Sequence, residues 1–171
     1  GIGAASHLCG MLFMQAVEAP IVTVPYKGTG PAMTELLGGQ IDIMCDQTTN
    51  TTAQIEGGRI KAFAVTTAQP LSGHPVLKHY PTLQEMGMKG FNLTIWHGLY
   101  APKGTPPAIT KMLNDALKKS LKDPDFIKKN EALGALVVND KRVEPEEHKK
   151  FVAAEMIKIK AAVDAAGKYA D

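Results

Sequence analysis

The 171-residue sequence lacks the features that would assign it to a membrane, to nucleic acid or to a metal. It contains no stretch approaching the roughly 18–20 consecutive apolar residues of a transmembrane helix. Its net charge is only +2, which is too small to indicate nucleic acid as a partner. Its five histidines show no spacing typical of a metal site. The composition is that of an ordinary globular protein, for which we expect no metal, no cofactor and no nucleic-acid partner.

The sequence also lacks a recognisable catalytic motif. Cys45, His7 and Asp46 have side chains that suit a nucleophilic site, but no nucleophile elbow surrounds them and no spacing fixes a base beside the thiol. On a strand, Cys45 would point away from Asp46, because successive side chains face opposite sides. We therefore predict that the chain is not an enzyme.

Glycine and charge are unevenly distributed along the chain. Thirteen of the 16 glycines lie within residues 1–100, which carry a net charge of −1, whereas residues 101–171 carry +3. The first part is therefore expected to be rich in loops, and the second part to consist of charged surface helices. The change in composition predicts a boundary near Gly98–Gly104.

In the first part, short helical segments alternate with short β-branched segments. We expect helices at 7–18, 31–37 and 51–56, the first capped by Ser6, and strands at 21–24, 41–45 and 60–67. Residues 82–87 resemble one or two helical turns, and 91–96 an extended segment. This order predicts an α/β fold with a mainly parallel sheet.

The second part predicts three amphipathic helices and a single strand. The helices are expected within 104–123, 124–134 and 145–167, and the strand at 135–139. One strand cannot cover the apolar stripes of three helices, so these stripes need a sheet that this part does not contain. We therefore expect the chain to start inside a larger fold.

Three strand-to-helix loops are predicted to meet at one edge of the sheet. They span residues 1–6, 25–30 and 46–50, and each precedes a helix N-terminus that offers free N–H groups and about half a positive charge. Small residues in these loops let a ligand approach the backbone. Open α/β sheets bind ligands at this edge, so the pattern predicts an anion site for a carboxylate or a phosphate.

The side chains in these loops have alternative roles. Lys27 could pair with an anion or stay solvated, and Tyr26 could face a ligand or the core. Asp46 could cap Thr48 and Thr49, or accept hydrogen bonds from a ligand.

Several stretches together resemble a known family. They are "GIGAASHLCG", "VPYKGTGPAMTELLGGQIDIMCDQ", "GGRIKAFAVTT", "YPTLQEMG" and "WHGLYAPKGTP". In order and spacing they are similar to the solute-binding receptors of tripartite tricarboxylate transporters, the Bug family. The similarity covers essentially the whole chain.

This resemblance implies a periplasmic binding protein-like α/β fold of type II. Residues 1–97 would form one complete lobe, the second, with a mainly parallel sheet. Residues 98–171 would be the return segment, the C-terminal part of the first lobe. Family members are nearly twice as long and begin with a signal peptide, so the N-terminal segment of the first lobe is expected to be missing here.

The resemblance also implies a function. The parent protein would be exported to the periplasm, close its lobes around a small organic carboxylate, and dock on the membrane subunits of its transporter. The ligand contacts implied for this lobe are Gly3, Ala4, Ala5, Ser6 and His7, then Tyr26, Lys27 and Gly28, and then Asp46 and Gln47. Self-association of the fragment is a further expectation.

Other possibilities stay open from the sequence. An exported protein can form a disulfide, so Cys9 and Cys45 are either bonded or two buried thiols. Trp96 is expected at the crossover between lobes or in the core. The alternative functions are a ligand-sensing effector domain of a transcription regulator and an enzyme acting on a small organic acid.

Overall fold

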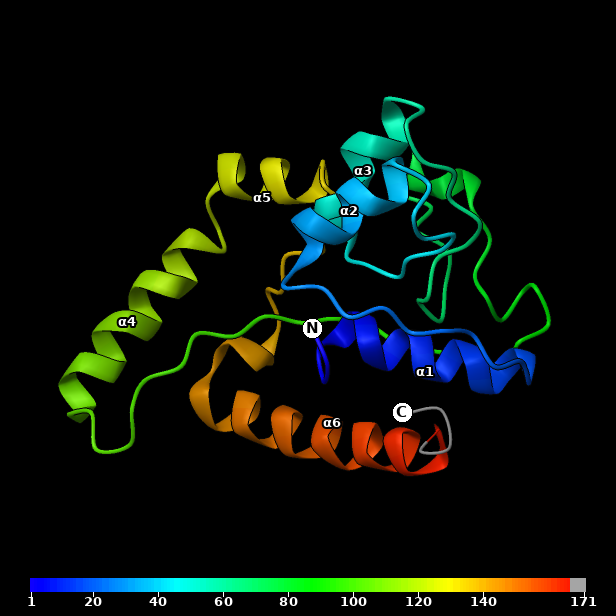
Figure 1. Cartoon of the computed structure of the whole chain (residues 1–171). Helices are drawn as coiled ribbons and strands as arrows, with labels where there is room; N and C mark the ends of the chain where they lie inside the picture. Colours follow the sequence, from blue (N-terminus) through cyan, green and yellow to red (C-terminus); the bar gives the residue numbers. More distant parts are fainter. Residues whose placement is uncertain (167–171) are drawn as a thin grey trace.

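A computed structural model describes residues 1–166 of the chain (Figure 1). Among these residues, none lies in a helix long and apolar enough to cross a membrane. The C-terminal end of the last predicted helix, at residue 167, lies outside the described residues. The helical elements are α1 (Ala5–Val17), α2 (Thr29–Leu37), α3 (Thr48–Glu56), the 3₁₀ turn η1 (Leu77–His79), α4 (Pro107–Ser120), α5 (Pro124–Glu131), the 3₁₀ turn η2 (Lys141–Val143) and α6 (Pro145–Ala166).

The start of α1 differs from the prediction that Ser6 caps it. Gly3 has a positive φ of 78°, and the turn around it is closed by a hydrogen bond from the Ala4 N–H to the Gly1 carbonyl at 3.0 Å. Ala4 is therefore the N-cap residue, and Ser6 lies inside the first turn. The Ser6 prediction is wrong because glycine allows the chain to turn two residues earlier.

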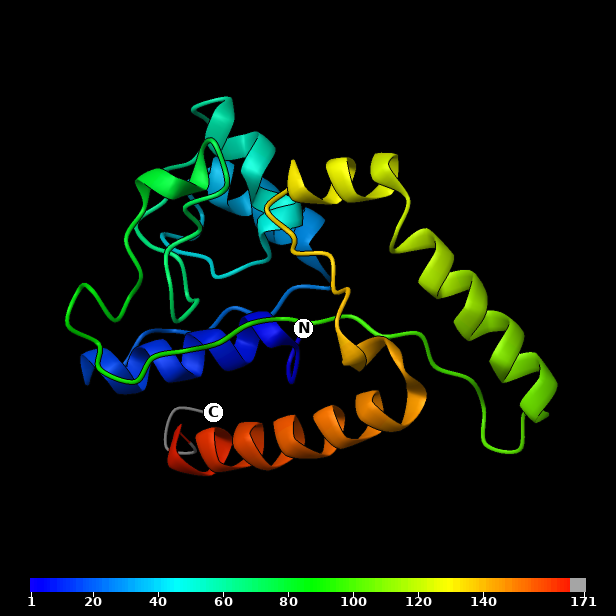
Figure 2. The ribbon, with the colours of Figure 1, turned by 180° about the vertical axis from the view of Figure 1, so that it is seen from behind.

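The core is built around α1. Leu8, Met11 and Met14 form one buried cluster, against which Leu93 and Ile159 pack. Helix α6 lies alongside α1 in both views, and the extended segment that contains Leu93 passes along the same helix (Figures 1 and 2). Residues from both predicted parts of the chain therefore share one apolar core.

The predicted parallel sheet is not formed as a regular hydrogen-bonded ladder in residues 1–166. The segments expected to be strands are extended, and the isolated parallel bridge between Val65 and Thr82 is the pairing found among the described residues. Strand pairing needs a neighbouring strand and a covered face to set its register. Here Val22 is 88% exposed and Leu136 is 82% exposed, so neither segment has that cover. The predicted strands at 21–24, 41–45, 60–67 and 135–139 are therefore extended segments and not regular strands of a sheet.

Helix α4 projects away from the other helices (Figure 1). Its apolar residues Ile109, Met112 and Leu113 are exposed. This arrangement agrees with the prediction that the second part cannot cover its own apolar stripes.

A buried polar junction connects the end of α5 to the first part. The hydroxyl of Thr48 donates to the Gly134 carbonyl at 3.1 Å, and the hydroxyl of Thr52, only 1% exposed, contacts the Leu133 carbonyl at 3.4 Å. The ring Nε2 of His74 lies 3.1 Å from the Ala132 carbonyl oxygen. Side chains from the first part therefore satisfy carbonyl groups that the end of a helix leaves without partners. The division of the chain into residues 1–97 and 98–171 stays a prediction. The hydrogen bonds of this junction connect the two parts.

The hydrogen bonds of His74 define the tautomer of its neutral ring. Its Nδ1 accepts from the backbone N–H groups of Val76 and Leu77, each at 3.1 Å. Because Nδ1 accepts, the proton lies on Nε2, which donates to Ala132. The imidazole thus links three backbone groups at a site where it is only 6% exposed.

We predict that His74→Phe lowers the free energy of unfolding by about 2–3 kcal/mol, because it leaves buried N–H and C=O groups unpaired at nearly constant volume. Urea denaturation followed by circular dichroism measures this change. His79→Phe is the matched control, since His79 is exposed on the adjoining turn. Equal stability of the two variants would contradict the role given to His74.

Candidate anion-binding site

The N-terminal ends of α1, α2 and α3 lie next to one another. The Gly1 backbone approaches the second loop so closely that a Cβ there would lie 3.7 Å from the Tyr26 carbonyl oxygen. The hydroxyl of Thr29, the first residue of α2, donates to Asp46 Oδ2 at 2.7 Å. In both views the N-terminus lies beside the start of α2 (Figures 1 and 2). The three loops predicted to meet are therefore brought together by the fold.

Asp46 connects two of these helix ends. Besides the bond from Thr29, its Oδ1 accepts from the Gln47 backbone N–H at 2.6 Å and from Asn50 Nδ2 at 2.8 Å. Asn50 Nδ2 also lies 3.2 Å from the Thr29 hydroxyl. Asp46 thus has a structural role, although its partners are not the expected N–H groups of Thr48 and Thr49.

The first turns of the helices retain unpaired backbone donors. Within residues 1–166, no protein acceptor is found for the N–H groups of Thr48 and Thr49 in α3, of Thr29 and Gly30 in α2, or of Ala5, Ser6 and His7 in α1. The partial positive charge of a helix N-terminus adds to the attraction of such groups for an anion. The arrangement can therefore hold a carboxylate by several backbone hydrogen bonds.

The first loop offers fewer free amides than the sequence predicts. The Gly3 N–H donates to His7 Nδ1 at 3.2 Å, so this amide already has a partner. The hydrogen bond also places the remaining proton of a neutral His7 ring on Nε2, which makes that nitrogen a donor. His7 is thereby oriented by its own loop.

The second loop contributes a glycine with a positive φ and an exposed lysine to the site. Gly28 has a φ of 110°, which a residue with a side chain rarely adopts. Lys27 is exposed and has no ion-pair partner among the described residues, and Tyr26 is half-buried. A cation beside free amide groups adds to the affinity for an anion.

Three residues at these loops were missed by sequence reasoning. Thr29, Asn50 and His97 are not among the ligand contacts implied by the sequence, yet all three make hydrogen bonds at these loops. In the structure, His97 Nε2 lies 2.9 Å from Gln47 Oε1. The sequence carries no signal for that pairing, because 50 residues separate its members.

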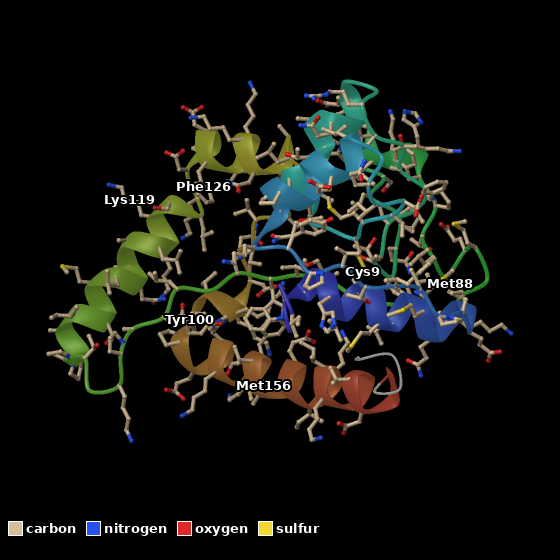
Figure 3. All side chains as sticks on the ribbon, viewed as in Figure 1. Cys9, Met88, Tyr100, Lys119, Phe126 and Met156 are labelled. Carbon is tan, nitrogen blue, oxygen red and sulfur yellow. A yellow bond between two sulfur atoms is a disulfide. The ribbon has the colours of Figure 1, made fainter. Side chains whose placement is uncertain are left out.

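A disulfide connects α1 to the segment that precedes Asp46. Cys9 and Cys45 are bonded, with their Cα atoms 6.2 Å apart, within the separation of about 7 Å that a bridge can span. Cys9 is buried at 3% exposure and lies on the side of α1 that faces the extended segments (Figure 3). Of the two states open from the sequence, the disulfide is therefore the one found.

In the second part of the chain, hydrogen bonds with cationic side chains lower the pKa values of carboxyl groups. The side chain of Arg142 hydrogen-bonds Asp140 and lowers the pKa of that carboxyl group to about 2. Hydrogen bonding between Lys150 and Glu147 likewise lowers the pKa of the Glu147 carboxyl. These are exposed ion pairs at η2 and α6, so they serve the second part of the chain. The described residues contain no cluster of metal-ligating side chains.

The sequence matches the family described as tripartite tricarboxylate transporter family receptor over residues 1–168. The chain belongs to this receptor family. It is 45% identical, over 168 residues, to the UPF0065 protein in the TAR-I ttuE-ttuC' intergenic region of Agrobacterium vitis. The alignment covers 98% of this chain and 48% of that protein. The chain thus spans about half the length of this relative.

Solved structures show the same fold. The periplasmic binding protein BugD matches with a TM-score of 0.91 and 46% identity, covering 98% of this receptor chain and 55% of BugD. The R. palustris protein Rpa4515 with adipate matches with a TM-score of 0.88 and 30% identity, over 96% and 53% of the two chains. MatC from Rhodopseudomonas palustris with bound malate gives 0.87 and 33%, over 94% and 54%.

These matches identify the fold class. The receptor chain has the periplasmic binding protein-like fold that the sequence predicts, and its extended segments belong to that architecture. The family and the solved structures are receptors and binding proteins, which supports neither the regulator alternative nor the enzyme alternative.

We predict that removing the disulfide of this receptor chain lowers its free energy of unfolding by about 3–4 kcal/mol, as expected for a cross-link between residues 36 apart in sequence. Urea denaturation with and without dithiothreitol measures the effect. The Cys9→Ala/Cys45→Ala double variant is the control, because dithiothreitol should not change its stability. An unchanged midpoint for the reduced wild type would contradict the prediction.

We predict that Asp46→Ala destabilises the receptor chain by about 1–3 kcal/mol, because the donors of Thr29, Gln47 and Asn50 lose a charged acceptor. Asp42→Ala is the matched control, since Asp42 is an exposed carboxylate in the same segment. Thermal and urea unfolding of both variants provide the comparison. If the two substitutions cost the same, Asp46 does not hold the helix ends together.

Proposed function

We propose that this chain contributes one side of a binding site for a small carboxylate in an extracytoplasmic solute-binding receptor. One observation supports the proposal most directly: three helix N-termini lie side by side and keep unpaired backbone N–H groups. Backbone donors and helix dipoles that converge on one position favour an anion. The site we propose consists of the ten loop residues predicted from the sequence, among which Asp46 holds the helix ends together, and of the first-turn N–H groups of Thr29, Gly30, Thr48 and Thr49.

The structural relatives support a dicarboxylate as the ligand class. Rpa4515 is described with adipate and MatC with bound malate, and both acids carry two carboxylates. One carboxylate would be held by the first-turn amides of α2 and α3, with Lys27 nearby. The second would extend toward the part of the receptor that this chain does not span.

The family supports the remaining assignments. We infer that the ligand is bound and released unchanged, because the family consists of receptors. We place the protein in the periplasm, where BugD acts as a binding protein, and propose the membrane subunits of a tripartite tricarboxylate transporter as its partners. Self-association of the chain stays a prediction.

NMR titration tests the carboxylate site without requiring tight binding. Succinate should shift the backbone amide signals of Thr29, Gly30, Thr48 and Thr49, because the acid accepts hydrogen bonds from these groups. Succinamide, which has the same length and no charge, is the matched control and should leave them in place. Malate, adipate and citrate extend the series. Equal shifts from succinate and succinamide would contradict an anion site.

We predict that Thr49→Pro weakens succinate binding about tenfold relative to Thr49→Ala, because proline removes one charge-assisted N–H donor from the first turn of α3. Both variants lose the threonine side chain, so their difference isolates the backbone donor. Proline is tolerated in a first helical turn, and circular dichroism checks that the fold is retained. Equal affinities would exclude the Thr49 amide from the site.

A further inference from the structure

We propose that His97 is a positioning residue of the carboxylate site, holding the Gln47 side chain so that its amide group is presented to the ligand. The inference rests on the proposed function, because it assigns a role within that same site. Its basis is the 2.9 Å contact between His97 Nε2 and Gln47 Oε1. A carboxamide oxygen only accepts, so His97 Nε2 carries a proton and donates it.

The residues on either side of His97 are held against α6. Trp96 packs edge-on against Phe151, with ring centroids 5.2 Å apart, and against His148 at 6.0 Å. Gly98 approaches α6 so closely that a Cβ there would lie 2.6 Å from the His148 ring Nε2. Both neighbours of His97 are therefore fixed on the same side of the crossover segment.

Because side chains alternate along an extended backbone, the His97 side chain lies on the side of the segment opposite to α6. Successive side chains of an extended segment face opposite directions. With Trp96 and Gly98 turned toward α6, the ring of His97 is turned toward α3, where it meets Gln47. Tyr100, which contacts His148 at 3.1 Å through its hydroxyl, lies near the start of α6 (Figure 3) and anchors the segment further along. The aromatic contacts on α6 thus determine where His97 can reach.

Gln47 gains an orientation from this contact. It is the N-cap residue of α3, but its side chain makes no capping hydrogen bond. With its oxygen engaged by His97, the side-chain NH₂ group is left as a donor without a partner among residues 1–166. Gln47 directly precedes Thr48 and Thr49, whose first-turn N–H groups are unpaired among the described residues. A carboxylate bound there would accept from both the backbone and the Gln47 amide.

Side-chain substitutions at both ends of the contact test the proposal. His97→Leu should weaken succinate binding about fivefold, the effect of losing one orienting hydrogen bond. His97→Gln should restore binding, because its amide nitrogen can donate to Gln47 Oε1. His79→Leu is the control for a histidine outside the site. NMR titration gives all four affinities, and thermal unfolding shows whether stability differs between the variants.

A double-mutant cycle asks whether His97 acts through Gln47. Gln47→Ala alone should weaken succinate binding, and His97→Leu should cause no further loss in that background. A merely structural role for His97 would predict additive losses and no rescue by His97→Gln. Additive losses, or a His97→Leu affinity equal to that of His79→Leu, would overturn the proposal.

Failure of the proposed function and failure of the inference about His97 give different results. Absence of succinate binding by the wild-type chain would overturn the carboxylate site, and the ligand role of His97 with it. Binding that His97→Leu leaves intact would overturn this inference alone. In the ligand-free protein, the Gln47 side-chain NH₂ signals should shift in His97→Leu and remain unchanged in His79→Leu. Unchanged signals in His97→Leu would also overturn the proposal.

Discussion

The site depends on the carboxylate of Asp46, which lies between the N-terminal ends of α2 and α3. Two helix N-termini placed together bring two partial positive charges into contact, an arrangement that needs a compensating anion. Asp46 supplies it and bonds Thr29, Gln47 and Asn50. Because these bonds occupy its oxygens, an incoming anion must be stabilised by groups that Asp46 does not use. The unpaired first-turn amides are such groups.

The scaffold around this pair of helix ends is assembled from distant segments. The disulfide ties α1 to the segment before Asp46, and the side chains of Thr48 and Thr52 hold α3 against the end of α5. The crossover segment is anchored on α6 through Trp96. Thr48 and Thr52 thus restrain α3 itself, the disulfide restrains the segment that leads into it, and Trp96 restrains the segment that carries His97. A preorganised set of donors loses less entropy when it binds a ligand.

This organisation fits the binding role that we propose. Backbone amides recognise a carboxylate by charge and shape and leave it chemically unchanged, whereas catalysis requires a reacting group held within reach of the substrate. In the described residues the one cysteine pair is consumed in a disulfide, and His7 is bonded within its own loop. The exposed apolar residues of α4 and of the extended segments fit a chain that spans about half the length of its relatives.

The sequence by itself determined the approximate positions of the main helices, the three small-residue loops and the family, because apolar periodicity and motif spacing act over a few residues. It could not determine that Gly3 would turn the chain early enough to make Ala4 the cap, nor that the described β-branched segments would form no regular ladder beyond the bridge between Val65 and Thr82. It also left open whether Cys9 and Cys45 are bonded. Only the tertiary structure decided that Asp46 meets Thr29 and that His97 meets Gln47. Those partners are 17 and 50 residues apart, and contacts across such separations exist only once packing of the whole chain has brought their segments together.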